Sequence, residues 1–175
     1  MTKNRAAAAA AMALLIVSSC ARVPAPVSAP RLKAPDGGWV ARTLRRMTVE
    51  EKVGQMVACR FTADFRNADN AGLRELESLV TRSGIGGLIL FAPADVRETA
   101  ELVNGFQRLA KVPLLMASDF ERGAANRVTG PTLFPPFMAL GATGSEGLAY
   151  AMGRVTALEG RAMGIHMTYA PVVDV

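Results

Sequence analysis

Short apolar runs alternate along the chain with segments in which an apolar residue recurs every three or four positions. The runs "IGGLILF" (85–91) and "VPLLMASD" (112–119) predict buried strands, because continuous apolar stretches of this length fit strands that are covered on both faces. The helical spacing predicts helices over 70–84, 94–111 and 145–164. The middle of the chain therefore has the strand and helix alternation of an α/β protein.

The flanking segments extend this pattern. Thr48 followed by Glu51 is a capping-box signature for a helix start, and "QMVACRF" (55–61) then predicts a strand. After a long loop through 130–141 and one more helix, "IHMTYAPVVDV" (165–175) predicts the last strand. The order is helix, β, α, β, α, β, loop, α, β, which requires a parallel sheet covered on both faces or closed into a barrel.

The number of predicted strands indicates only part of a barrel. Four strands are fewer than the eight of a (β/α)8 barrel, and the last one has no helix after it. We therefore expect about four βα units from the N-terminal part of a TIM barrel, as a fragment of a longer protein.

The first residues have the pattern of an export signal. Lys3 and Arg5 precede an apolar run, 6–18, that is too short to span a bilayer comfortably. The small residues of "IVSSC" resemble the processing site of bacterial lipoproteins, so we expect a lipoprotein-type signal peptide over 1–19 and lipidation of Cys20. An ordinary signal peptide with an incidental cysteine is the alternative.

The segment after the signal is expected to be an extended tether. Four prolines among alanine, valine and serine in 21–38 disfavour a helix or a strand. We expect the lipidated cysteine and its linker to occupy 20–38 and the folded domain to occupy 39–175.

Composition limits the partners and the redox chemistry. Half of the 175 residues are hydrophobic, which is enough for a domain with a substantial core. The net charge of +5 is not gathered in a basic run with interleaved aromatics, so nucleic acid is not an expected partner. Cys59 lies in an apolar run and is expected to be a small buried hydrophobe, which leaves no disulfide framework.

Several kinds of chemistry lack their motifs. The phosphate loop and the nucleophile elbow are absent, and "GIGGLI" (84–89) lacks the spacing of a dinucleotide site. The single histidine, His166, precedes a predicted strand and is expected to be a packed or surface residue. With one histidine and no cysteine pair, neither a metal site nor a cofactor is expected.

Charged residues cluster where the strand over 112–119 ends. Asp119, Glu121, Arg122 and Arg127 lie within nine positions. If the strand continued, both carboxylates would point to the same side, at the end where parallel barrels assemble active sites. Neighbours on one strand cannot flank a glycosidic bond, so they do not make a complete two-carboxylate glycosidase site.

Two interpretations of this cluster are open on these residues alone. In one, Asp119 accepts hydrogen bonds from a polar ligand, while Glu121 pairs with Arg122 or Arg127 and supports the loop. In the other, the cluster is a solvated surface group with no ligand.

Five segments resemble a known family when they are taken in order. The chain from about residue 44 to 175 looks like the N-terminal (β/α)8 domain of glycoside hydrolase family 3, which includes β-glucosidases and β-N-acetylhexosaminidases. The segments are "MTVEEKVGQM", "IGGLILF", "VPLLMASDFERG", "FPPFMALGAT" and "EGRAMGIHMTYAPVVDV".

The resemblance implies roles for individual residues. Asp119 matches the family acid that binds sugar hydroxyls in the −1 subsite, and Arg127 lies at the spacing of a family substrate-binding arginine. Arg122 departs from the pattern, since a glycine is common there. The family's nucleophile, an aspartate on a later strand, would lie beyond Val175, so no catalytic residue is assigned and the chain alone is expected to be inactive.

The resemblance also implies an activity. We expect part of an exported, membrane-anchored glycosidase that cleaves terminal β-linked sugars by a retaining mechanism, with a β-N-acetylhexosaminidase preferred. The alternatives are a β-glucosidase of the same family and a non-catalytic sugar-binding lipoprotein on the same barrel. Another TIM-barrel enzyme would rest on the fold alone.

Overall fold

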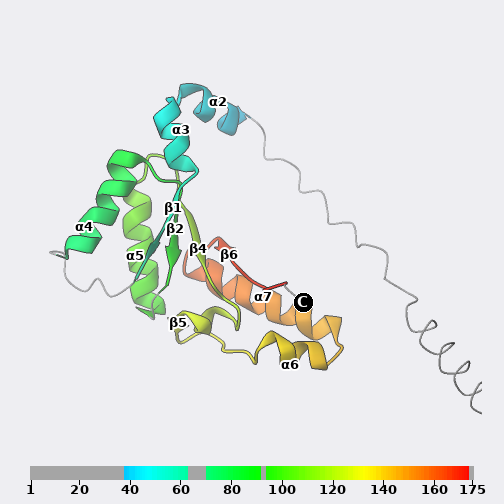
Figure 1. Cartoon of the computed structure of the whole chain (residues 1–175). Coiled ribbons are helices and arrows are strands. Elements are labelled where there is room, and N and C mark those ends of the chain that lie inside the picture. Colours follow the sequence, from blue (N-terminus) through cyan, green and yellow to red (C-terminus); the bar gives the residue numbers. More distant parts are fainter. Residues whose placement is uncertain (1–37, 63–69, 92–93, 174–175) are drawn as a thin grey trace, which may run out of the picture. The chain divides into compact units, whose positions relative to one another are not determined.

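The computed structural model describes residues 38–62, 70–91 and 94–173 (Figure 1). Trp39–Val175 forms one compact unit. The signal peptide over 1–19, Cys20 and the linker up to residue 37 lie outside the described residues, so those expectations stay predictions. Within the described ranges, no helix is both long enough and apolar enough to cross a bilayer.

Helices and strands alternate along the described chain, which confirms the α/β class. The main helices are α2 (Gly38–Arg46), α3 (Val49–Gln55), α4 (Ala71–Ser78), α5 (Val96–Leu109), α6 (Phe137–Ala142) and α7 (Glu146–Ala162). A π-helical turn, η1 (Leu79–Ser83), extends α4, and a 3-10 turn, η2 (Ala124–Asn126), follows the central strand. The strands are β1 (Ala58–Phe61), β2 (Gly87–Leu90), β3 (Ala94–Asp95), β4 (Leu115–Ser118), β5 (Val128–Thr129) and β6 (Met167–Thr168).

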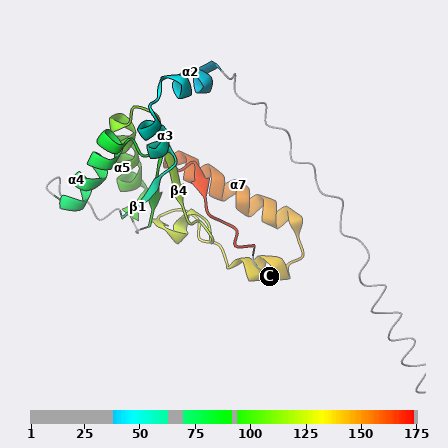
Figure 2. The same ribbon diagram turned by 45° about the horizontal axis from the view of Figure 1, so that its top comes forward.

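The main sheet is parallel and follows the order of the chain. Its strands lie in the order β1-β2-β4-β6, and a separate short pair joins β3 to β5. The carboxyl ends of the four strands therefore lie along one edge, as in a barrel that has been opened. Figures 1 and 2 show α4 and α5 together on one flank of the sheet and α7 beside β6 on the other.

Local sequence signals set several helix ends. Thr48 and Glu51 form the predicted capping box, in which each side chain accepts from the other residue's backbone N–H. Asn70 caps α4, Asp95 caps α5, and Gly84 ends η1 in the left-handed conformation with φ 61°. Glycine reaches this conformation without the steric cost that a Cβ imposes.

The core lies between the sheet and its helices. Phe61 on β1 meets Phe106 on α5 edge to face, with ring centroids 5.6 Å apart. Leu88, Leu90 and Met116 are fully buried in the same cluster. Cys59 is a free, half-buried thiol that packs against this cluster, so it is less enclosed than expected.

Several predicted elements have different bounds in the structure. The strand expected over 55–61 starts only at Ala58, because α3 runs through Gln55. The strand expected over 165–175 pairs only at Met167–Thr168. The expected loop over 130–141 contains most of α6, which begins after Pro136, because the fixed φ of proline is compatible with a helix start.

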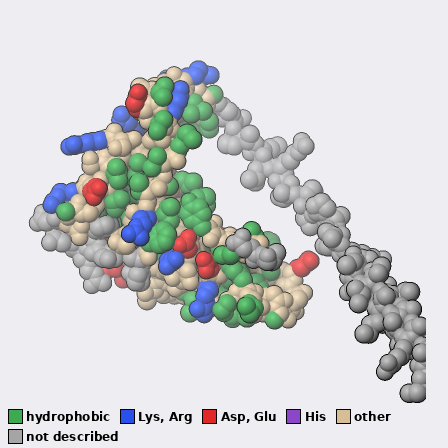
Figure 3. Space-filling model, in the orientation of Figure 1, with side chains coloured by type: hydrophobic (Ala, Val, Ile, Leu, Met, Phe, Trp, Pro, Cys, Tyr) green, Lys and Arg blue, Asp and Glu red, His purple; other side chains and the backbone are tan. Residues whose placement is uncertain are grey.

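The second face of the sheet is less covered than the face toward α4 and α5. Successive side chains of a strand point to opposite faces, so residues that alternate with Phe61 and Met116 point away from those helices. Arg60 is exposed there, and Leu115 is 47% exposed. Figure 3 shows hydrophobic side chains gathered in the middle of the molecule, with acidic and basic side chains next to them.

Candidate functional site

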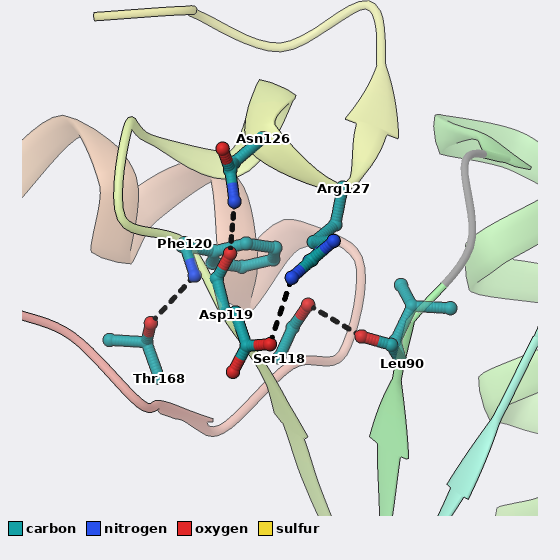
Figure 4. Close-up of polar contacts among 7 residues, drawn as sticks. All are labelled: Leu90, Ser118, Asp119, Phe120, Asn126, Arg127 and Thr168. Atoms are coloured by element: carbon teal, nitrogen blue, oxygen red, sulfur yellow. Dashed lines mark hydrogen bonds and ion pairs between the residues drawn. The ribbon is translucent and has the colours of Figure 1, made fainter. Parts of the chain in front are cut away.

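Asp119 lies directly after the last residue of β4, at the carboxyl end of the sheet. Its Oδ2 accepts a hydrogen bond from Arg127 Nη2 at 3.0 Å, and the two charged groups form an ion pair through this contact (Figure 4). The two side chains are 18% and 31% exposed, respectively, so solvent screens this pair less than a surface pair. The structure thus brings together the two residues predicted to bind substrate.

Arg127 makes a second contact with the aromatic ring of Phe91. The guanidinium carbon lies 5.3 Å from the centroid of that ring, within the range of a cation–π contact. Phe91 follows β2, so this contact joins the carboxyl ends of β2 and β4. The buried Nε of Arg127 has no hydrogen-bond partner among the described residues, so the arginine is held through its Nη2 and its face.

The loop after Asp119 is fixed by backbone and side-chain hydrogen bonds. Asn126 Nδ2 donates to the carbonyl oxygen of Asp119 at 2.7 Å, which ties η2 back to the end of the strand. Phe134 N–H donates to the carbonyl oxygen of Arg122 at 2.9 Å, and Arg122 Nε donates to the carbonyl oxygen of Phe134 at 3.2 Å. Gly123 between them has φ 83°.

The outer part of the loop is bound to α7. Glu159 on that helix accepts hydrogen bonds from both the backbone N–H and the hydroxyl of Thr132, at 3.1 and 2.7 Å. A charged acceptor strengthens such bonds. The loop is therefore anchored at the strand end, at Arg122 and at α7, which limits the positions that Asp119 can take.

The expected pairing of Glu121 with Arg122 or Arg127 is not present among the described residues. Arg127 pairs with Asp119, and Arg122 donates to a backbone carbonyl. Within the described ranges Glu121 has no ion-pair partner, and it is exposed. The reason is that β4 ends at Ser118 and the chain turns, so the alternation that would put Glu121 beside Asp119 does not continue.

Two side-chain hydroxyls, those of Ser118 and Thr168, join neighbouring strands near Asp119. Ser118 is fully buried, and its hydroxyl donates to the carbonyl oxygen of Leu90 at 3.0 Å (Figure 4). Phe120 N–H donates to the Thr168 hydroxyl at 3.0 Å. These bonds continue the joins from β2 to β4 and from β4 to β6 beyond the short ladders.

His166 joins β6 to β4 and has a structural place. Its Nδ1 accepts a hydrogen bond from the Met116 backbone N–H at 3.1 Å, and the backbone N–H of His166 donates to the Met116 carbonyl oxygen at 2.8 Å. Nδ1 must be unprotonated to accept, so the bond requires the neutral ring. The prediction that His166 is a packed or surface residue agrees with this position.

The pH dependence of stability should report on His166. Partial burial of the ring, and secondarily the charge of Arg161, lower the pKa of His166 below its ordinary value of 6.5. Below about pH 6.5 the unfolded chain therefore binds more protons than the folded one, and stability decreases as pH falls. We expect the Tm to fall between pH 7.5 and 5 and His166→Asn to flatten this slope.

Thermal unfolding across this pH range measures the effect. Because His166 is the single histidine of the sequence, NMR of its ring protons assigns the titration directly. A ring that titrates at or above 6.5, or the same slope in the variant, would show that Nδ1 is not held as an acceptor.

The Asp119 carboxylate presents hydrogen-bond acceptors at the carboxyl edge of the sheet. A carboxylate accepts hydrogen bonds from hydroxyl groups, and the Asp119 carboxylate is oriented by Arg127. Among the described residues, no group of three or more acidic, histidine or cysteine side chains could hold a metal ion. Sequence reasoning missed Phe91 and Asn126, although Asn126 stands beside Arg127 in the segment that it singled out.

Comparison with known proteins gives the family. Residues 48–175 match the model of the glycosyl hydrolase family 3 N-terminal domain. The chain is 33% identical over 138 residues to a beta-N-acetylglucosaminidase/beta-glucosidase of Cellulomonas fimi, covering 78% of this chain and 23% of the relative. It is 32% identical over 152 residues to a beta-hexosaminidase A of Pseudoalteromonas piscicida, covering 74% and 25%.

Solved structures share the arrangement of the sheet and helices. One is beta-glucoside phosphorylase BglX bound to 2FGlc, with 26% identity and a TM-score of 0.70 over 82% of this chain and 25% of that one. Another is NagZ from Neisseria gonorrhoeae in complex with N-trifluoroacetyl-D-glucosamine, with 28% identity and a TM-score of 0.55 over 68% and 36%.

These relatives are much longer than this chain. The chain spans about a quarter of the length of the two curated relatives. Its four parallel strands agree with the expected part of a barrel. The chain belongs to glycosyl hydrolase family 3, and the described sheet is part of the N-terminal domain of that family.

Proposed function

We propose that this chain supplies the sugar-binding edge of a retaining β-glycosidase that releases terminal β-linked sugars. The observation that carries the proposal is the Asp119 carboxylate, which Arg127 holds at the carboxyl end of β4. In this role Asp119 accepts hydrogen bonds from sugar hydroxyls, and Arg127 orients the carboxylate and binds the sugar beside it. Interactions that strengthen in the transition state would then raise the rate as well as the affinity.

The reacting groups come from the rest of the protein in this proposal. A retaining glycosidase needs a nucleophilic carboxylate and a general acid on opposite sides of the glycosidic bond. Asp119 is bound to Arg127 and its neighbour Glu121 faces solvent, so neither fills both roles. The 175-residue chain alone is accordingly proposed to be inactive.

We favour a β-N-acetylhexosaminidase as the specific activity. Its support is the likeness of the "SDFERGAANR" segment and the names of relatives such as the beta-hexosaminidase of Bordetella pertussis, 36% identical over 100 residues. A β-glucosidase is the runner-up, supported by the periplasmic beta-glucosidase of Salmonella typhimurium at 31% identity over 139 residues. A sugar-binding lipoprotein without catalysis is the third possibility.

The test uses the complete protein that contains this chain. Its turnover of an aryl N-acetyl-β-glucosaminide and of the corresponding aryl β-glucoside would be measured, with and without inorganic phosphate. Faster, phosphate-independent hydrolysis of the N-acetyl substrate supports the proposal, and faster turnover of the glucoside supports the runner-up. Sugar binding without turnover of either substrate would leave the non-catalytic alternative.

Export and lipid anchoring at Cys20 are part of the proposal. The short apolar run before "IVSSC" and the periplasmic location in the name of one relative support export. We expect Cys20→Ala to leave the protein unprocessed or released from the membrane, because the acceptor of the lipid is lost. Membrane fractionation and the mass of the mature protein check this, and no change in either would show that the cysteine is incidental.

A further inference from the structure

We propose that Arg60 is a further substrate-binding residue, whose guanidinium donates to the carbonyl oxygen of an N-acyl group on the bound sugar. The inference rests on the proposed glycosidase function and names the side chain that selects an amino sugar. Three features of Arg60 support this role: the direction of its side chain, its place relative to Asp119 and its free hydrogen-bond donors.

The burial pattern of β1 sets the direction of Arg60. Phe61 is 2% exposed and packs on Phe106 of α5, so it points into the core on the helix side. Cys59, which precedes Arg60, also packs against that core. Because neighbours on a strand point to opposite faces, the exposed Arg60 lies on the face away from α4 and α5.

The parallel register places Arg60 on the same face as Asp119. Arg60 is opposite Ile89 on β2, and Ile89 is opposite Ala117 on β4. Phe91 and Asp119 lie two residues further along, each directly after the last residue of its strand, so the alternation through Leu90 and Ser118 places them on this face. Arg60 on β1, Phe91 directly after β2 and Asp119 directly after β4 therefore lie on one face of the sheet.

Phe91 connects Arg60 to the Asp119 site. Its N–H donates to the carbonyl oxygen of Phe61 at 2.9 Å, so the pairing of β1 with β2 extends to the level of Phe91. The ring of Phe91 makes the cation–π contact with Arg127. Neighbouring strands are about 4.8 Å apart, which puts β1 and β4 about 10 Å apart. Side chains from these two strands can then flank one sugar unit.

The site needs a donor that Asp119 and Arg127 do not fully supply. An ionised carboxylate only accepts hydrogen bonds. Arg127 uses Nη2 for Asp119, and its Nε is buried. Arg60 has no hydrogen-bond or ion-pair partner among the described residues, so its donors are free. The carbonyl oxygen of an N-acyl group only accepts, and it therefore complements Arg60.

In a closed barrel the charge of Arg60 would need a hydrogen-bond acceptor even more. The face that bears Arg60 would point to the interior of the completed barrel. Arginine keeps its charge there, and an uncompensated buried charge is costly. Either the ligand or an acidic residue elsewhere in the protein must compensate it, and these two cases predict different results.

The experiment compares two substrates in the complete protein. The kcat/KM for an aryl N-acetyl-β-glucosaminide and for the aryl β-glucoside would be measured for the wild type, Arg60→Gln and Arg60→Lys. Arg108→Gln is the matched control, since it removes the same charge from the last turn of α5, at the opposite edge of the sheet. Thermal unfolding of each variant, with and without N-acetylglucosamine, separates binding from stability.

We expect Arg60→Gln to lower kcat/KM at least tenfold for the N-acetyl substrate and less than threefold for the glucoside. Arg60→Lys should retain part of the preference, and Arg108→Gln should change neither substrate. An equal effect on both substrates, no effect, or a loss of Tm with unchanged kcat/KM would overturn the inference, and the last result would indicate an acidic partner within the protein. A wild type that hydrolyses neither substrate would instead refute the proposed function.

Discussion

Asp119→Asn is expected to lower kcat/KM of the complete protein at least tenfold while the fold remains intact. Hydrogen bonds to a charged carboxylate contribute about 1.5–3 kcal/mol each, and 1.4 kcal/mol corresponds to a factor of ten. The amide retains an oxygen that can accept from Arg127, so the geometry of the loop should persist. Part of the loss should appear in kcat, because the sugar is held more tightly in the transition state.

Glu121→Gln is the matched control for this prediction. It removes the same charge two residues away, from an exposed side chain with no ion-pair partner among the described residues. We expect kcat/KM within about threefold of the wild type and an unchanged Tm, because exposed charges contribute little. If Asp119→Asn retained wild-type kcat/KM, or if both variants lost activity equally, Asp119 would not be a specific sugar ligand.

Gly123→Ala is expected to disrupt the loop that holds Asp119. The φ of 83° disfavours any side chain, and an added Cβ would lie 2.5 Å from the Thr132 carbonyl oxygen and 2.7 Å from the Phe134 ring. The backbone strain alone costs about 1–3 kcal/mol, and the contacts with Thr132 and Phe134 add to it. We expect a decrease of at least about 2 kcal/mol in the free energy of unfolding, together with a loss of sugar affinity.

Gly141→Ala provides the comparison for this second variant. Gly141 lies in α6, has no positive φ, and an added Cβ would meet no atom within 4 Å. Alanine should therefore be neutral or stabilise the helix by about 0.5–1 kcal/mol. Urea unfolding of both variants measures the difference. Equal stability of the two would mean that the loop can rearrange around residue 123.

Local signals in the sequence predicted the elements well. The Thr48 capping box depends on two residues three positions apart, so the sequence alone predicts it. The apolar runs at 85–91 and 112–119 contain β2 and β4, because a parallel sheet buries such strands. The helix α6 was missed because two prolines before Phe137 read as a loop, although proline is compatible with a helix start.

The candidate site was predicted in its residues but not in its contacts. Asp119 and Arg127 were both predicted as substrate-binding residues from the sequence. Their 3.0 Å ion pair joins two residues of one short segment, which the sequence had singled out. The Phe91 contact joins two strands that are far apart in sequence, and no periodicity encodes it. The position of Glu121 depends on the end of β4 at Ser118, which the apolar run over 112–119 does not mark.

The most direct test is the structure of the complete protein bound to N-acetylglucosamine. We expect a sugar hydroxyl to donate to Asp119 at about 2.6–3.0 Å, the usual range for such bonds, with Arg127 still paired to the carboxylate. We also expect the sugar to lie at the carboxyl edge of β4. A sugar bound elsewhere, with Asp119 contacting only Arg127, would contradict the assignment of this edge as the sugar site.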